Sequence, residues 1–224
     1  SHQDAINKGR RAHREARSDL WEVPYLPIDP EDVGRSYEAI IRINSQSGKG
    51  GIAYILQADY GLNLPRNLQV EFREVIQEIT DREGIELSSE RIHQAFMATY
   101  VDLPSPRIRF VGHTTAPDPD DPEGRIVDAV LIDGNEEIGI RGFGTGPIDG
   151  FVDAINRHYE LSMTVRDYSE HSLQHGSDAA AICYMEMDNA DKRVFGVGIN
   201  KNIVAASLEA IVSAVNRVRA APQG

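Results

Sequence analysis

The sequence predicts an α+β fold, in which small mixed or helical subdomains precede a domain of two pseudo-symmetric βββα units. The main reason is a repeat: in each copy, two strand-like runs joined by a polar turn lead through a Gly-x-Gly tripeptide into an amphipathic helix. The repeated part starts at Arg125 in the first copy and at Ala180 in the second. Two such units can bury their apolar sheet faces against each other, and the seam between them is a natural ligand site.

The composition is that of an ordinary globular protein, and the charge limits its partners. Of its 224 residues, 41% are hydrophobic and 26% are charged, and the formal net charge is −12. A nucleic-acid or anionic-membrane binder would need a basic face, so neither partner is expected. No apolar run approaches the roughly 20 residues of a membrane span, and no signal-peptide core is present. We therefore expect a soluble, cytoplasmic protein.

Residues 1–30 are predicted to form a first subdomain. The chain opens at Ser1 without an initiator methionine, and the basic stretch Arg10–Arg14 follows, which we interpret as a helix cut from a longer protein. Prolines then recur within the run Trp21–Pro30 and exclude both a helix and a central strand, so this run is predicted to be a rigid, extended connector.

Residues 31–103 are predicted to form a second, α/β subdomain. Strands are expected at Ala39–Ile43 and at Ile52–Leu56, joined by a glycine-rich turn. Further along, apolar residues recur with the spacing of one helical face. They are Leu68, Phe72, Val75, Ile76 and Ile79. A second helix is expected to begin at Ser88 or Ser89, either of which is a suitable N-cap.

Residues 104–224 are predicted to hold the two βββα units. The strands are expected at residues 107–115, 127–132 and 137–142 in the first unit and at residues 162–172, 180–187 and 193–198 in the second. Pro147 suits the first position of the first helix, where its missing N–H costs nothing. Asn200 or Asn202 is expected to cap the second helix.

The two glycine corners, Gly142–Gly144 and Gly196–Gly198, are interpreted as equivalent positions. A glycine-rich turn before a helix aims N–H groups at an anion, but Pro147 and Lys201 stand where a dinucleotide fold needs its third glycine. Two interpretations stay open: a corner that binds a small carboxylate, and close packing of strand on helix. Metal-ligand spacings and serine-nucleophile motifs are absent from the sequence, and Cys183 suits a buried apolar position better than a nucleophile. The residues alone indicate a ligand-binding or regulatory module.

Several motifs resemble one enzyme family. The run Trp21–Arg35, the motif Asn44–Gly51 and the opening Ser1–Ala5 are similar to the region that follows the catalytic barrel in actinobacterial-type 2-isopropylmalate synthases. The segments Gly196–Ile199 and Ala205–Leu208 are similar to the end of that region. The resemblance covers nearly the whole chain.

The resemblance implies that the full-length enzyme condenses acetyl-CoA with 2-oxoisovalerate in leucine biosynthesis. Its TIM barrel would carry a divalent metal, so this chain would hold no cofactor or metal and would be inactive alone. Residues 1–30 and 31–103 would be linker subdomains, and residues 104–224 a regulatory domain that binds L-leucine as a feedback inhibitor. The implied partners are a second copy, in a homodimer, and the catalytic barrels of both subunits. His2 and Tyr25 of the linker would act in trans at the partner's active site.

The resemblance also implies that leucine binds near the first glycine corner. The implied residues are Gly144, Thr145, Gly146, Pro147, Ile148, Tyr168, Ser172, Ala179 and Ile199. N–H groups at the helix start would hold the ligand's carboxylate, and Asp167 or a carbonyl its ammonium group. The family often has asparagine at the position of Thr145 and alanine at that of Ser172, where the hydroxyl adds polarity to a pocket for an aliphatic side chain.

Two alternatives remain open at the level of sequence. The first is a citramalate synthase, whose homologous domain senses isoleucine instead of leucine. The second is a stand-alone amino-acid-binding or dimerisation module without any enzyme. A barrel encoded upstream of Ser1 would exclude the second alternative.

Overall fold

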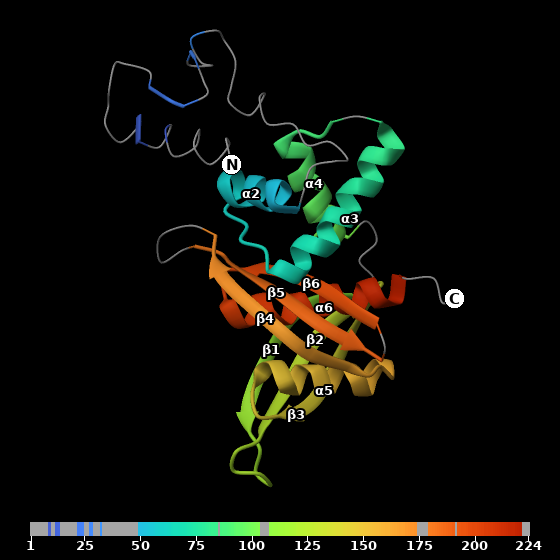
Figure 1. The fold of residues 1–224 in the computed structure, drawn as a ribbon. Coiled ribbons are helices and arrows are strands. Elements are labelled where there is room, and N and C mark those ends of the chain that lie inside the picture. The colour runs from blue at the N-terminus through green and yellow to red at the C-terminus, as the bar shows by residue number, and fades with distance from the viewer. Residues whose placement is uncertain are drawn as a thin grey trace.

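The computed structural model describes residues 9, 12–13, 22–24, 27–28, 32, 49–84, 86–103, 108–173, 179–190 and 192–220. Its helices are α2 (Lys49–Tyr60), α3 (Arg66–Glu83), α4 (Ser89–Tyr100), α5 (Pro147–Tyr159) and α6 (Ile203–Ala220). Its strands are β1 (Ile108–Pro117), β2 (Arg125–Asp133), β3 (Glu136–Gly144), β4 (Met163–Ser172), β5 (Ala181–Asn189) and β6 (Lys192–Asn200). Figure 1 shows α2, α3 and α4 grouped on one side of the body that the strands form with α5 and α6.

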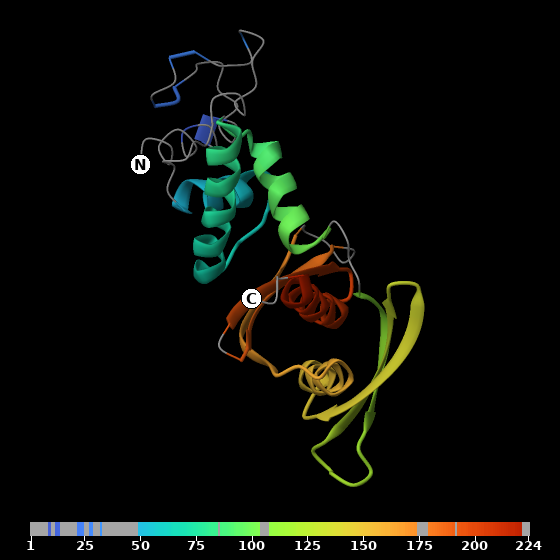
Figure 2. The same ribbon diagram turned by 90° about the vertical axis from the view of Figure 1, so that its right-hand side faces the viewer.

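The strands form two antiparallel three-stranded sheets, in the orders β1-β2-β3 and β4-β5-β6. Each sheet is followed by its own helix, α5 or α6, so the predicted α+β fold with two βββα units is confirmed. Both first strands carry a bulge at the corresponding place, between Phe110 and Gly112 in β1 and between Val165 and Asp167 in β4. Helices α5 and α6 lie in the space between the two sheets (Figure 2).

The inner core lies between the two sheets and these helices. Each central strand sends every second side chain into it, which is the period expected of a strand. These residues are Val127, Ala129 and Leu131 on β2 and Cys183, Met185 and Met187 on β5. Helix α5 adds Phe151 and Ile155, and helix α6 adds Ile211 and Val215, all fully buried.

A second core forms where the outer face of the second sheet packs against α2, α3 and α4. Tyr184 on β5 and Phe195 on β6 share this core with Phe72, Phe96 and Tyr100 of the helices. The rings of Phe96 and Tyr100 lie 5.1 Å apart, and Phe72 meets Phe96 edge-on at 5.3 Å. Strand β5 is therefore buried on both of its faces, and the helices and the second unit form one packed body.

Polar groups strengthen this attachment. Arg217 of α6 donates to Glu71 of α3 over 2.7 Å and to the carbonyl of Phe195, and its guanidinium lies 4.6 Å from the centre of the Tyr100 ring. The Tyr100 hydroxyl also donates to Glu71, over 3.0 Å. Burial, and then the Glu71 carboxylate, raise the pKa of Tyr100, so its hydroxyl stays a neutral donor.

Two asparagines join the βββα units in a reciprocal way. Asn216 of α6 accepts from the N–H of Ile108 (3.0 Å) and donates to its carbonyl (2.8 Å) at the start of β1. Asn156 of α5 makes the same two bonds, each 2.8 Å long, with Met163 at the start of β4. Each helix thus satisfies backbone groups of the first strand of the other unit.

The strand predicted at Ile52–Leu56 is wrong, because these residues lie within α2. Ile52, Ile55 and Leu56 are buried at the i, i+3, i+4 spacing of a helix, against α3 and α4. A short apolar run fits a strand or a helical turn equally well, so periodicity alone does not distinguish them. The strand predicted at Ala39–Ile43 lies outside the described residues.

The predicted helix starts are largely confirmed. Helix α3 buries Leu68, Phe72 and Ile76 of the expected apolar face. The other two residues of that face, Val75 and Ile79, are half-buried against the same core. Ser88 is the N-cap of α4, not Ser89, and its hydroxyl accepts from the N–H of Arg91 over 3.2 Å. At the start of α6, the side chain of Asn202 accepts from the N–H of Ala205 over 3.1 Å, so Asn202 is the cap.

The two glycine corners do not correspond in the way that the sequence suggested. Counted from their first residues, β3 and β6 align Gly142 with Gly198. A Cβ atom added to Gly142 would overlap the backbone of Gly150 and Ala154 in α5, and one added to Gly198 would overlap the carbonyl of Ala206 in α6. Of the two interpretations left open, these glycines support close packing of strand on helix.

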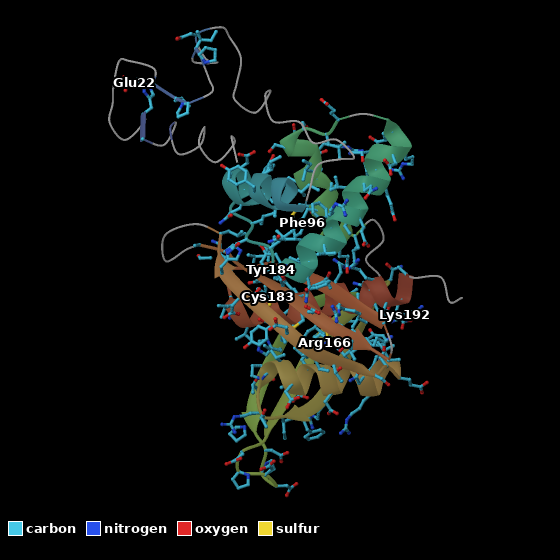
Figure 3. All side chains as sticks on the ribbon, viewed as in Figure 1. Glu22, Phe96, Arg166, Cys183, Tyr184 and Lys192 are labelled. Atoms are coloured by element: carbon cyan, nitrogen blue, oxygen red, sulfur yellow. The ribbon has the colours of Figure 1, made fainter. Side chains whose placement is uncertain are left out.

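Cys183 lies on β5 beside Tyr184 (Figure 3), and burial raises the pKa of its thiol to about 11. Because the thiolate is the reactive form, we expect the folded chain not to react with Ellman's reagent at neutral pH. The chain unfolded in guanidinium chloride should react at once, which the absorbance of the released thionitrobenzoate measures. Rapid labelling of the folded chain would mean that β5 opens to solvent.

Candidate functional site

A pocket of about 740 Å³, here called the α5–β4 pocket, opens where the first unit meets the second. Ligand pockets usually have volumes of about 300–1,000 Å³, so this one can hold a small molecule. The β3–α5 corner supplies Thr145, Gly146, Pro147 and Ile148, α5 supplies Asp149, Val152, Asp153 and Asn156, and β4 supplies Met163, Thr164, Val165 and Tyr168. The pocket therefore lies in the seam between the units, where the repeat predicted a ligand site.

The start of α5 has no side-chain cap. Its N-cap is Gly146, Pro147 follows, and no side chain caps this helix. The start of α6 differs, because Asn202 accepts from the N–H of Ala205 there. An uncapped helix start offers N–H donors and a partial positive charge, both of which favour a carboxylate. The uncapped start of α5 therefore favours such a group more than the capped start of α6 does.

Two carboxylates of α5 line the same pocket. Asp149 accepts from the N–H of Thr145 (3.0 Å) and from its hydroxyl (3.3 Å). Asp153 accepts from the N–H of Phe143 (2.9 Å) and forms an ion pair with Arg157 (2.8 Å). These bonds order both carboxylates beside the helix start. A ligand that carries an ammonium group next to a carboxylate would complement this arrangement.

The remaining wall of the pocket is apolar. Val152 and Met163 are buried, and Ile148 and Val165 are half-buried against the inner core. The carboxamide of Asn156 holds the backbone of Met163 through two hydrogen bonds, which fixes the start of β4 against α5. An aliphatic side chain placed between α5 and β4 would be removed from water on both sides.

The structure brings together most of the predicted effector residues. Those that line the α5–β4 pocket are Thr145, Gly146, Pro147, Ile148 and Tyr168. Gly144 precedes them and faces α5, where an added Cβ would lie 2.6 Å from the nitrogen of Gly150. Tyr168 and Ser172 pair with Met185 and Ala181, which face the inner core, so both project from the same face of β4. Ser172 itself does not line the pocket.

The other predicted residues do not meet at this pocket. Ala179 is half-buried just before β5, and Ile199 on β6 packs toward the core shared with α2, α3 and α4. Neither of them lines the α5–β4 pocket. His2 and Tyr25 lie outside the described residues.

The α5 side of the pocket was missed by the sequence analysis. Asp149, Val152, Asp153 and Asn156 follow the i, i+3, i+4, i+7 spacing of one helical face, which is a signal that could have found them. Asp167, considered for the ligand's ammonium group, does not line the pocket, and its carboxylate accepts from the N–H of the next residue over 2.9 Å.

Neither a metal site nor a membrane-spanning helix is found in the described part of the chain. There, no three His, Cys, Asp or Glu side chains gather in a way that could hold a metal ion. Nor does any helix within the described ranges combine the length and the apolar character needed to cross a membrane.

Comparisons with known proteins bear on both units and on the pocket. Residues 86–219, more than half of the chain, match the family described as the LeuA allosteric (dimerisation) domain. The chain belongs to this family. The matched residues of the LeuA domain include both βββα units and the whole lining of the α5–β4 pocket. Residues 1–57 match a second family, described as alpha-isopropylmalate synthase, post-catalytic domain-like.

Curated relatives that contain this LeuA-type region are similar over nearly all of the chain. The chain is 67% identical to the 2-isopropylmalate synthase of Brucella suis biovar 1 and 64% identical to that of Mesorhizobium japonicum, each over 97% of the chain. It is 47% identical to the 2-isopropylmalate synthase of Mycobacterium leprae, again over 97% of the chain. The chain spans only 39%, 39% and 37% of these three proteins. The predicted resemblance to 2-isopropylmalate synthases is confirmed.

Proposed function

We propose that the chain is the linker and regulatory part of a 2-isopropylmalate synthase, and that the α5–β4 pocket binds L-leucine as a feedback inhibitor. The observation that carries the proposal is the make-up of this pocket, in which an uncapped helix start, ordered carboxylates and apolar walls meet. The match to an allosteric domain family supports a regulatory role for this region.

The carboxylate, the ammonium group and the isobutyl group of leucine would each meet a complementary part of the pocket. The carboxylate of leucine would accept from the first-turn N–H groups of α5. Its ammonium group would lie against Asp149, since Asp153 is already paired with Arg157. Its isobutyl group would contact Ile148, Val152 and Val165, and full burial of such a side chain contributes about 1.5–3 kcal/mol. Leucine would thereby bridge α5 of the first unit and β4 of the second.

Strand β4 offers a route from the pocket to the helices. It pairs with β5, whose other face packs on α2, α3 and α4. Near the end of β4, Nε2 of His171 accepts from the N–H of Asn63 in the α2–α3 connection, over 3.2 Å. A ligand that draws α5 toward β4 would move the first unit relative to the body formed by the second unit and the helices. Leucine would then bind the arrangement after this shift more tightly than the arrangement before it. Allostery requires such a difference in affinity between two arrangements.

In the full-length enzyme this region would serve a catalytic barrel that condenses acetyl-CoA with 2-oxoisovalerate. We assign the divalent metal to that barrel and expect the chain alone to be inactive. We propose residues 1–30 and 31–103 as linker subdomains and residues 104–224 as the regulatory domain of a cytoplasmic protein. His2 and Tyr25 of the linker would reach the active site of the partner subunit.

A second copy of the chain is the proposed partner of the regulatory domain. Tyr168, Glu170 and Ser172 on β4 are exposed, although their pairing partners on β5 all face the inner core. These three residues therefore form a strip on the inner face of the second sheet. The strip lies beyond the first part of β4, which α5 covers. A partner copy would cover the strip beside the mouth of the α5–β4 pocket. The dimerisation role in the family's description supports this assignment.

Isothermal titration of the folded chain with leucine, isoleucine and valine tests the proposal. We expect leucine to bind most tightly. Tyr168→Ala should weaken leucine binding at least about tenfold, because it removes one wall of the pocket. Val70→Ala on α3 is the control, since Val70 is also an exposed apolar side chain but does not line the pocket, and it should change the affinity less than about twofold.

Two outcomes would count against the proposal. If sedimentation and circular dichroism show a folded dimer that binds none of the three amino acids, the chain has no effector site of this kind. If isoleucine binds more tightly than leucine, the isoleucine-sensing domain of a citramalate synthase becomes the better assignment.

A further inference from the structure

A second pocket, of about 310 Å³, lies between α6 and β1 and is here called the α6–β1 pocket. As in the α5–β4 pocket, the helix of one unit faces the first strand of the other, but β6 and the segment after α4 complete this pocket in place of a helix start. In each pocket an asparagine of the helix binds the first residue of that strand, Asn156 to Met163 and Asn216 to Ile108. We infer that the α6–β1 pocket is a second binding site, for a small apolar α-amino acid.

The size and the walls of this pocket suit such a ligand. Its volume is at the lower end of the range of about 300–1,000 Å³ found for ligand pockets, which leaves room for a free amino acid but little more. The side chains of Phe110, Val197, Ile199 and Val212 make its lining mostly apolar. An aliphatic ligand side chain would be desolvated among them.

Glu209 is the polar feature that points to a ligand with a positive charge. This half-buried residue of α6 accepts from the side-chain amide of Asn200 over 2.7 Å, and within the described residues no cationic side chain pairs with it. Burial raises its pKa, which reflects the cost of the uncompensated charge. Asp153, at the same position of α5 counted from the helix start, already has Arg157 as its partner. An ammonium group in the α6–β1 pocket would supply the missing counter-charge.

Arg109 supplies the opposite charge at the same pocket. It follows Ile108 on the edge strand β1, is exposed, and makes no ion pair with any other described residue. Arg109 pairs with Ile132, which alternates with the inward-facing Leu131, so its guanidinium starts on the outer face of the sheet and would fold around the edge of β1 to reach the ligand. A guanidinium binds a carboxylate through two parallel hydrogen bonds, so Arg109 and Glu209 together would bind both charged groups of one zwitterion. A 2-oxo acid would bring no ammonium group to Glu209 and is therefore disfavoured.

The position of the pocket gives such a site a direct contact with the helices. Val101, Asp102 and Leu103, which directly follow α4, form one of its walls. Beside this wall, the hydroxyl of Ser213 on α6 donates to the carbonyl of Tyr100 over 2.5 Å. A ligand in the α6–β1 pocket would touch the end of α4, whereas a ligand in the α5–β4 pocket reaches the helices only through the second unit.

Methyl NMR spectra of the intact chain can separate the two sites, because each pocket has its own isoleucine and valine. Valine or leucine in the α6–β1 pocket should shift the methyl signals of Ile199 and Val212. Binding in the α5–β4 pocket should shift those of Ile148 and Val152. The α6–β1 site can therefore be tested apart from the leucine proposal, since the two sets of signals are read independently.

Two variants test the ligand contacts, and a third is the control. Glu209→Gln and the exposed Arg109→Ala should each weaken the titration seen at Ile199 and Val212 at least about tenfold. Asp153→Asn, the equivalent change on α5, should leave that titration within about twofold of the original chain. If both α6–β1 variants titrate like the original chain, Glu209 and Arg109 do not bind the ligand and the inference fails.

The remaining outcomes are also decisive. Shifts at Ile148 and Val152 alone would overturn the second site while supporting the first. Shifts at Ile199 and Val212 alone would support the second site and remove the first. Shifts at neither pair would refute both. Equal titration of Ile199 and Val212 by 2-oxoisovalerate would overturn the assignment to amino acids.

Discussion

Replacing Gly196 by alanine is expected to prevent folding or to lower the free energy of unfolding by more than about 4 kcal/mol. Gly196 lies on β6 against α6, where an added Cβ would overlap the carbonyl of Ala210 and lie 2.6 Å from the nitrogen of Ala214. Both are backbone atoms of a packed helix, which cannot rotate away as a side chain can. Domains are typically stable by only about 5–15 kcal/mol, so one methyl group here removes a large share of the total.

Urea denaturation followed by circular dichroism measures this effect. Gly139→Ala on β3 is the matched control, because Gly139 is an exposed strand glycine with nothing within 4 Å of an added Cβ. Its free energy of unfolding should change by less than about 1 kcal/mol. Similar unfolding curves for the two variants would contradict the close contact between β6 and α6 on which the second unit depends.

The βββα repeat could be predicted from the sequence because its signals are local. The polar turn between the strands predicted at residues 127–132 and 137–142 contains Asp133-Gly134, a hairpin signal, and Gly134 has the positive φ, 64°, that such a turn needs. Pro147 opens α5 as expected. Helix α2 could not be predicted in this way, since the run Ile52–Leu56 suits a strand or a helix, and the contacts that decide between them come from α3 and α4.

The part of the candidate site that the sequence could predict is the part whose signals are local. The corner Thr145–Ile148 is contiguous in the chain, so a local motif could point to it. The β4 wall, including Tyr168, lies opposite this corner only because the second unit packs on the first. The α5 face from Asp149 to Asn156 was missed because the amphipathic pattern of a helix indicates only the apolar stripe that packs on its own sheet. The second contact surface of this helix can be predicted only when the arrangement of the two units is known.

Asn216→Ala is expected to lower the free energy of unfolding by about 2–4 kcal/mol. The variant removes the carboxamide that binds both the N–H and the carbonyl of Ile108, a residue with only 1% of its surface exposed. A buried backbone group left without a partner costs about 1–3 kcal/mol. Asn202→Ala is the control for chemical denaturation, since it removes an exposed helix cap and should cost about 1 kcal/mol.

Asn156→Ala completes this test, because it separates the stability of the seam from the geometry of the α5–β4 pocket. It leaves the N–H and the carbonyl of Met163 unpaired, so the free energy of unfolding should also fall, by roughly 1–3 kcal/mol. Only Asn156 lines the α5–β4 pocket, so leucine affinity there should fall in Asn156→Ala and stay within about twofold in Asn216→Ala. The methyl signals of Ile148 and Val152 measure this affinity at temperatures where both variants are folded. An equal loss in both variants would mean that the two asparagines act by holding the units together, and that Asn156 has no separate part in positioning β4 for the ligand.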